Sequence, residues 1–341
     1  MIDFAPIRNR LFSLGFKVRH QNLAEIPRIS FVDMGMIPKL GWREYIHFSR
    51  NFEAYRKNLS DRDWSCLTYC YPRSYYLLYY YFLFWWADYC NVLDDVVQSP
   101  DRSLIAELFF RYIMELDRLI DDPGYGRGML MDPLRLKRNP EASGYLSAFL
   151  RRLPGTNNQP GVGRRICERF WKYRRDCLTI CQDTLRPGSG LEEILLCKEV
   201  TVGGLFYTWS AILGGLYCPE SSQPLVENAG IVLSKACMAM QVYEDLLDLP
   251  EDYRGGVSNI FHEILKLHPE EHGSCKEYVD TVPWNHLDGI WARRNLPDSF
   301  RMAQGIVDRY HKRAFDVSQV QEKATGLCQM IGKVNSHPIG I

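Results

Sequence analysis

The chain has 341 residues, with 41 Lys and Arg against 41 Asp and Glu, so its formal net charge is zero. Proteins that bind the phosphate backbone of nucleic acids normally carry a basic surplus, so we expect no nucleic-acid partner. Hydrophobic residues make up 46% and charged residues 24%, which excludes a mainly disordered chain. Aromatic residues reach 13%, a high share that any proposed function has to explain.

Proline and glycine divide the sequence into apolar segments, none of which alternates as a half-buried strand does. The first 60 residues contain several such breaks and predict irregular structure with one or two short helices. Paired Gly203 and Gly204 interrupt one of the later segments. Helices are predicted wherever a segment runs with few breaks, at residues 73–97, 101–121, 141–152, 164–185, 191–217, 224–249, 258–267, 275–293 and 298–325.

This pattern predicts one all-α domain with no repeats and no low-complexity linker. We divide it into an N-terminal segment 1–60, a helical domain 61–325 that carries the functional residues, and a C-terminal tail 326–341.

Eleven cysteines are present, and none forms a Cys-x-x-Cys pair. The N-terminus lacks the apolar run and cleavage site of a secretory signal, so we expect free thiols and a cytoplasmic protein. The most apolar stretch, 75–87, is too short and too rich in Tyr to cross a bilayer. We therefore expect no membrane span.

Two acidic groups lie within apolar segments. The first is the Asp94–Asp95 pair, near the end of the predicted 73–97 helix. Adjacent carboxylates there carry a large desolvation cost unless a cation or a cavity receives them. Acidic residues also oppose the dipole at a helix C-terminus, which disfavours a simple exposed end. The pair is therefore a candidate metal ligand, with an exposed helix end as the alternative.

The second group lies at the end of the 224–249 segment. Glu244, Asp248 and Asp252 are four residues apart, so they share one helix face, where like charges repel. Carboxylates among apolar side chains fit Mg²⁺, which takes few of them and completes its shell with water and phosphate. Pro250 could rotate Asp252 off this face. A solvated acidic face is the alternative.

Cationic side chains would neutralise a diphosphate held between the two acidic groups. The candidates are Lys198 just before the paired glycines, Arg254 beside the second acidic group, and the Arg309–Tyr310 pair on the last long helix.

Taken in order along the chain, these features resemble class I terpene synthases. The family's DDxxD/E motif is similar to Asp94-Asp95-x-x-Gln98, and its (N/D)DxxSxxxE motif places metal ligands at the spacing of Glu244, Asp248 and Asp252. It also has a diphosphate-sensing Arg where this chain has Lys198, and a C-terminal Arg-Tyr pair that looks like Arg309–Tyr310.

The chain departs from the family's motifs at several positions. Gln98 replaces the third acid, Glu244 and Asp248 replace Asn/Asp and Ser/Thr, and Lys198 replaces an Arg whose bidentate fork Lys lacks. These departures indicate a divergent branch, such as the atypical fungal humulene-type sesquiterpene cyclases.

The resemblance implies a single-domain helical bundle around a central active-site cavity. Three Mg²⁺ ions would bind there with the diphosphate, and farnesyl diphosphate would ionise and become a sesquiterpene such as humulene. Aromatic faces stabilise a cation by about 0.5–2 kcal/mol each, which would explain the aromatic content. The residues expected to line this pocket are Asn91, Gly203, Phe206, Trp209 and Met240.

Two other functions stay open. QVYEDLLDL is similar to the second Asp-rich motif of chain-elongating isoprenyl diphosphate synthases, and LPEDYRGGVSNIF to squalene and phytoene synthases. No GGKR-type basic stretch precedes Asp94, and the Arg309–Tyr310 pair favours a cyclase. The third reading is a non-catalytic helical scaffold. For the enzymes the expected partner is a small prenyl diphosphate, and a homodimer is left open.

Overall fold

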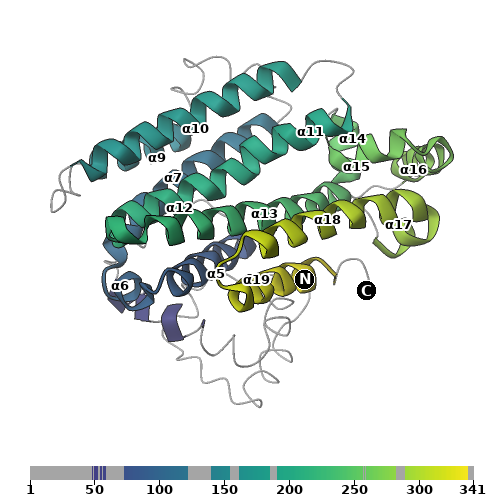
Figure 1. Cartoon of the computed structure of the whole chain (residues 1–341). Coiled ribbons are helices and arrows are strands. Elements are labelled where there is room, and N and C mark those ends of the chain that lie inside the picture. Colours follow the sequence, from purple (N-terminus) through teal and green to yellow (C-terminus); the bar gives the residue numbers. More distant parts are fainter. Residues whose placement is uncertain are drawn as a thin grey trace, which may run out of the picture.

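The computed structural model describes residues 48, 50–52, 54–55, 57–58, 73–121, 140–153, 161–184, 190–255, 257, 259–281 and 289–336. Every regular element within these residues is helical, which confirms the predicted all-α class (Figure 1). Most of the predicted N-terminal segment lies outside them.

The helices follow one another along the chain, and short turns connect many of them. They are α5 (Arg73–Tyr89), α6 (Leu93–Gln98), α7 (Pro100–Asp121), α9 (Pro140–Arg152), α10 (Val162–Thr184), α11 (Leu191–Lys198), the π-helical turn η4 (Glu199–Gly203), α12 (Gly204–Tyr217), the 3-10 turn η5 (Glu220–Ser222), α13 (Gln223–Leu247), α14 (Leu249–Gly255), α15 (Ile260–Lys266), α16 (Pro269–Thr281), α17 (Gly289–Asn295), α18 (Pro297–Val317) and α19 (Gln321–Ser336).

Helix α13 is the centre of the bundle. It packs chiefly against α12 and α18, with η4, α15 and α19 along its length (Figure 1). It runs antiparallel to α18, because Asn228 near its start bonds to Val317 and Tyr243 near its end bonds to Gln304. At 1.5 Å per residue its 25 residues span about 37 Å. Groups at its two ends therefore lie at opposite ends of the bundle.

Aromatic side chains fill the core between α5, α7 and α12. The rings of Phe82 and Phe206 meet edge to face with centroids 5.3 Å apart, and Phe110 lies 5.7 Å from Phe206. Trp209 donates its indole N–H to the Tyr79 hydroxyl at 3.3 Å. Much of the aromatic content therefore serves packing, at the geometries that ring quadrupoles prefer.

A buried polar hub joins three distant segments and consists of Tyr89, Asn228 and Ser318. The Tyr89 hydroxyl donates to Asn228 Oδ1 and lies 3.1 Å from Ser318 Oγ. The Asn228 amide donates to the Val317 carbonyl and accepts from the Gln319 amide at 3.0 Å. The hub thus holds the end of α5, the start of α13 and the α18–α19 junction together.

The predicted interruption at the paired glycines is present as the π-helical turn η4, which lengthens one turn of an otherwise continuous helix. A Cβ on Gly203 would lie 2.8 Å from Ser234 Oγ on α13, and one on Gly204 would lie 3.2 Å from the Tyr173 ring. A Cβ at either position would require the Ser234 or Tyr173 side chain to shift, so neighbouring elements approach this turn closely.

The prediction of one helix over 73–97 is wrong. Helix α5 ends at Tyr89, and the chain turns at Asn91, whose φ of 58° lies in the left-handed region that Asn tolerates. A new helix, α6, then begins at Leu93. The Asp94–Asp95 pair is therefore in the first turn of a short helix, where the dipole favours acidic residues.

Two C-terminal predictions also differ from the structure. The predicted 275–293 helix is replaced by α16 and α17, and the predicted 298–325 helix divides at Ser318 into α18 and α19. Helix α19 continues through Ser336, so residues 326–336 are helical rather than an irregular tail.

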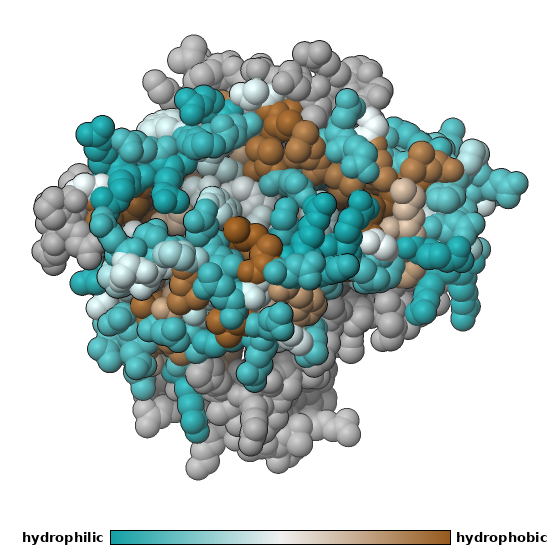
Figure 2. All heavy atoms as spheres, viewed as in Figure 1, coloured by the Kyte–Doolittle hydropathy of each residue, from teal (hydrophilic) through white to brown (hydrophobic). Residues whose placement is uncertain are grey.

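One described segment, Leu191–Tyr217, is apolar and long enough to cross a membrane by length and composition. Within its most apolar window 56% is buried, as in a core helix, which is consistent with the expected absence of a membrane span. The face in Figure 2 is mostly hydrophilic, with a hydrophobic area near its upper part. Eight cysteines have described side chains, and all eight are free thiols.

Candidate functional site

Asp245 is a buried acidic side chain near the end of α13. It is 3% exposed. Its Oδ1 accepts from the Gln241 side chain and lies 3.4 Å from the Lys198 ammonium. Its Oδ2 accepts from the Ile260 backbone amide at 2.7 Å. This carboxylate is buried with protein donors on both oxygens, as a buried charge requires.

Asn259 connects the backbone of Asp245 to the next helices. Its side-chain amide donates to the Asp245 carbonyl and to Asp252 Oδ2, both at 2.6 Å. Its Oδ1 accepts from the His262 amide at 3.0 Å, which caps the N-terminus of α15. One buried Asn thus fixes α13, α14 and α15 relative to one another.

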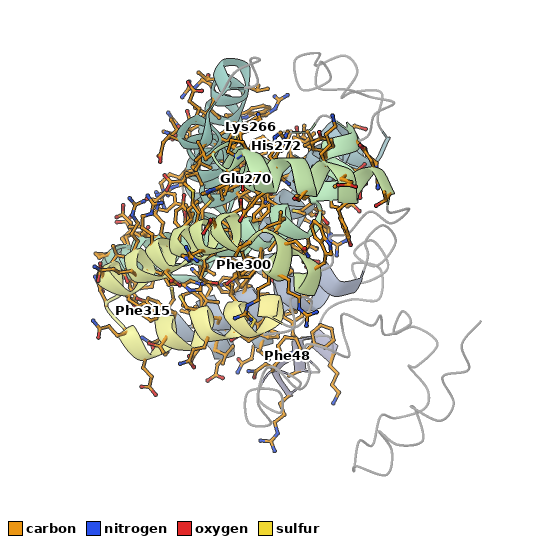
Figure 3. All side chains as sticks on the ribbon, turned by 90° about the vertical axis from the view of Figure 1, so that its right-hand side faces the viewer. Phe48, Lys266, Glu270, His272, Phe300 and Phe315 are labelled. Atoms are coloured by element: carbon orange, nitrogen blue, oxygen red, sulfur yellow. The ribbon has the colours of Figure 1, made fainter. Side chains whose placement is uncertain are left out.

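We call Lys198, Asp245, Asp248, Asp252 and Asn259 the α13-end cluster. The pKa of Asp252 is raised to about 6, chiefly by burial and also by the charges of Asp245 and Asp248, while the hydrogen bond from Asn259 and the charge of Lys198 oppose this shift. The cluster is therefore crowded with negative charge, which a bound cation would relieve. Figure 3 views the molecule from this end, with Lys266 and His272 of the neighbouring α15 and α16 labelled.

The predicted stripe of Glu244, Asp248 and Asp252 lies across the junction of α13 and α14. Helix α13 ends at Leu247, yet the Asp248 and Asp252 amides still bond to the carbonyls four residues earlier, so Pro250 does not break the turn. The charge of Asp245 on α13 raises the pKa of Asp252, whereas the charge of Glu244 raises the pKa of the buried Cys237 thiol. Asp245 therefore joins Asp248 and Asp252 in the cluster, and Glu244 is half-buried on the same helix.

The Asp94–Asp95 pair lies far from this cluster. Both carboxylates are exposed on α6. The Asp95 carboxylate lies near enough to Cys218 for its charge to raise the pKa of that thiol. Cys218 directly follows α12, and this end of α12 packs against Val226 at the start of α13. Asp248 follows Val226 by 22 residues, which corresponds to about 33 Å along a helix. Since Mg²⁺ binds oxygen at about 2.1 Å, the two acidic groups do not meet around one diphosphate in this structure.

Of the four predicted diphosphate-binding residues, only Lys198 is in the cluster. Arg254 donates to the Val279 carbonyl of α16 at 2.9 Å, and Arg309 is exposed on α18. Tyr310 is buried beside Glu199, and burial together with the Glu199 charge raises its pKa above the ordinary value.

Glu199 also pairs with Lys235 at 3.2 Å and with Arg313 at 3.4 Å. Tyr310 and Glu199 therefore belong to a network of charges that ties η4 to α13 and α18. Glu199, the shared partner in this network, directly follows Lys198 in the chain.

The predicted pocket residues divide into two groups. Phe206, Trp209 and Met240 are buried in the core, and Gly203 is buried against α13. Asn91, by contrast, is exposed at the α5–α6 turn. The left-handed turn at this residue moves it to the surface.

Sequence reasoning missed Gln241 and Asn259. The signal for Gln241 is its position four residues before Asp245 on an otherwise apolar helix, where such pairs face one another. Asn259 stands immediately before the apolar segment Ile260–Lys266, which is the place of an N-cap. Its contact with Asp252 follows from the turn between α14 and α15 and has no sequence signal.

The described residues contain no three His, Cys, Asp or Glu side chains arranged to hold a metal ion. Asp248 and Asp252 nevertheless supply two carboxylates, and Mg²⁺ is often held by one or two carboxylates together with substrate phosphates. The donor types thus fit Mg²⁺ bound with a diphosphate. Comparisons with known protein families, curated proteins and solved structures found no match.

Proposed function

We propose that the protein is a Mg²⁺-dependent enzyme that ionises an allylic prenyl diphosphate, farnesyl diphosphate, and releases a sesquiterpene and diphosphate. The observation that carries the proposal is the α13-end cluster, in which two carboxylates with a raised Asp252 pKa lie near a lysine and next to a π-helical turn. π-Helical turns occur frequently at functional sites.

In this proposal Asp248 and Asp252 hold Mg²⁺, and Asn259 orients Asp252 through its 2.6 Å hydrogen bond. Bound Mg²⁺ would supply Lewis-acid polarisation of the diphosphate oxygens. Lys198, 24% exposed, donates to the charge that develops on the leaving group. The exposed pair on α6 takes no part, which departs from the two-sided arrangement expected from the resemblance.

The hydrocarbon part of the substrate would extend along α12. Phe206 and Trp209 lie within two turns of η4 and face the aromatic core between α5 and α7. Their ring faces offer a cation stabilisation without a nucleophile. Their packing accounts for their burial by itself, so the test must come from products.

The test is incubation of the purified protein with Mg²⁺ and, separately, the C10, C15 and C20 allylic diphosphates, with products read by gas chromatography–mass spectrometry. We expect a hydrocarbon from the C15 substrate that disappears when EDTA is added. A longer diphosphate formed only with isopentenyl diphosphate would show a chain-elongating enzyme instead. No turnover of any substrate would overturn the proposal.

Two matched variants locate the site. Asp252→Asn removes a proposed metal ligand and should lower turnover at least 100-fold, in the range expected for disrupted metal ligation. Asp94→Asn changes an exposed carboxylate at the other end of α13 and should leave turnover within about two-fold. If Asp94→Asn is the inactive variant, the site is not at the α13-end cluster.

A second candidate is a non-catalytic helical protein. It is favoured by the full set of protein donors on Asp245 and by the distance between the two acidic groups. Saturating Mg²⁺ and pyrophosphate discriminate the two, because a ligand at 100 times its Kd stabilises the native state by about 2.7 kcal/mol. An unchanged melting temperature would favour the non-catalytic protein.

A further inference from the structure

Helix α10 carries a basic surface although the chain as a whole is neutral. Its 23 residues include six Lys or Arg and three Asp or Glu, whereas the whole chain has 41 of each kind. The helix lies at the upper edge of the bundle in Figure 1 and packs against α11 and α12. All six basic residues fall within 164–175, a stretch about 17 Å long. This surface therefore attracts a negatively charged partner.

The helical register of α10 separates the charged face from the core. Ile166, Phe170 and Tyr173 are buried, and the Phe170 ring lies 5.1 Å from the Phe149 ring of α9. The opposite side carries two rows of residues spaced three or four apart, which share one face of a helix. One row is Arg164, Glu168, Trp171 and Arg175, and the other is Arg165, Arg169, Lys172 and Asp176; all of them are exposed except Asp176, which is half-buried.

Three acidic side chains pair with this face without neutralising it. The pairs are Arg164–Glu168 at 2.8 Å, Lys172–Asp176 at 2.5 Å, and Arg165 with Glu220 of η5 at 3.9 Å. Each of these side chains is at least 40% exposed. Water screens such exposed pairs, so they are weak and easily exchanged for another anion. Arg169, Arg174 and Arg175 bring the basic residues to six, so positive charge stays in excess.

An exposed tryptophan lies on this basic face. Trp171 is 42% exposed, and the Arg174 guanidinium lies 5.3 Å from the centre of its ring. A single exposed apolar side chain needs no explanation by itself. Indole rings, however, favour the headgroup region of a membrane, and nearby Arg and Lys can reach lipid phosphates from there. The combination of basic charge and an exposed Trp favours an anionic lipid surface over a soluble acidic partner.

We propose that the outer face of α10 docks the protein onto the surface of an anionic phospholipid bilayer. Trp171 enters the headgroup region, and the arginines on either side of it, Arg164 and Arg175, bind lipid phosphates. Contact of this kind needs no membrane-spanning helix, because electrostatic attraction to the anionic leaflet adds to a small apolar burial. The inference is independent of the proposed catalytic function.

The test is cosedimentation of the full-length protein with vesicles of phosphatidylcholine alone, or of phosphatidylcholine with one third phosphatidylserine. We expect binding to the phosphatidylserine vesicles only. The affinity should fall about tenfold or more between ~50 and ~500 mM salt, because salt screens charges at a membrane surface. Equal binding to both kinds of vesicle, or binding to neither, would overturn the proposal.

Matched charge reversals locate the surface. Arg169→Glu combined with Arg175→Glu should weaken binding to phosphatidylserine vesicles about tenfold or more. Arg294→Glu combined with Arg301→Glu makes the same change in net charge at exposed residues of α17 and α18, away from α10 (Figure 1). That control should stay within about two-fold of the natural protein. An equal loss in both double variants would show dependence on net charge alone and would contradict docking through α10.

The tryptophan is tested separately from the charges. Trp171→Ser should weaken binding about tenfold through lost apolar burial. Leu267→Ser, at a residue that is 56% exposed on the α15–α16 turn, should leave binding unchanged. Circular dichroism checks folding, and Trp171→Phe serves as a second variant. Brominated lipids should quench the natural protein's fluorescence more than that of Trp171→Phe. Heparin binding that needs the arginines, without such lipid quenching, would indicate a soluble polyanion partner and refute the lipid assignment.

Discussion

Asp252 is a half-buried carboxylate of the α13-end cluster. Its folded-state pKa of about 6 lies above the ordinary value of 3.8, mainly because of burial. The native state therefore binds this proton more tightly than the unfolded state does. This contribution to the free energy of unfolding is fully present below pH 4 and is lost as the pH rises through 6.

Replacing the Asp252 carboxylate by an amide should remove this loss of stability at higher pH. Without Mg²⁺, Asp252→Asn should be more stable than the natural protein at pH 7 by about 1–2 kcal/mol, after allowance for partial exposure. The difference should vanish below pH 4. Urea unfolding at several pH values measures it, and Glu251→Gln, at the exposed neighbouring residue, is the control. A variant that is less stable at pH 7 would contradict the raised pKa.

From the sequence, the residues of the cluster could be predicted better than the arrangement of their side chains. Asp248, Asp252 and Lys198 are where the motif spacing put them, because i to i+4 backbone bonding continues past Pro250. Glu244 was chosen over Asp245 because the family spacing fits it. Which of two adjacent acids faces the interior depends on the neighbours Lys198 and Ile260, and those contacts are not visible in the sequence.

At the scale of the helices, close approach to neighbours decides where glycine is required. A Cβ on Gly214 would lie 2.3 Å from Val226 Cγ1 and 3.1 Å from Val226 Cβ, so the branched side chain cannot avoid it by rotating. A Cβ on the adjacent Gly215 would meet its nearest atoms at 3.8 Å, which is an ordinary contact. Of these two consecutive glycines, Gly214 thus has no room for a Cβ, whereas Gly215 has room for one.

This contrast gives a matched pair of variants. Gly214→Ala should lower the free energy of unfolding by about 1–3 kcal/mol through overpacking. Gly215→Ala should raise it by up to about 1 kcal/mol, because alanine is the better helix former. Chemical denaturation measures both. Adding Val226→Ala to Gly214→Ala should restore part of the loss, and equal effects of the two glycine variants would contradict the packing.

The helices could be predicted from the apolar periodicity, but some of their ends could not. The long segments at 101–121, 141–152 and 164–185 match α7, α9 and α10 to within about two residues, because proline and glycine mark their ends. The end of α5 has no such marker. It depends on one left-handed Asn91, and the error there moved the acidic pair to the wrong end of a helix.

At the scale of the whole molecule, the hub of Tyr89, Asn228 and Ser318 connects elements that are not neighbours in sequence. Asn228→Ala would leave the Val317 carbonyl and the Gln319 amide without this partner, and should lower the free energy of unfolding by about 2–4 kcal/mol. Gln319→Ala keeps the backbone amide and removes only an exposed side chain, so it should have little effect. Thermal and urea unfolding compare the two.

A double-variant cycle separates the hub from simple loss of a side chain. Tyr89→Phe removes the hydroxyl that Asn228 accepts from, so its effect should be smaller when Asn228 is already alanine. Additive effects of the two substitutions would show that the hydrogen bond contributes nothing by itself.

The hub also has a consequence for the order of folding. Its contacts join residues that are 139 and 89 positions apart, so each closes a long loop before any interaction rewards the closure. Contacts of such high sequence separation slow folding. The bonds from Asn228 to Val317 and Gln319 also cannot form before the α18–α19 junction has been synthesised. During translation, therefore, the start of α13 stays without these two partners until the chain has been made through Gln319, 91 residues later.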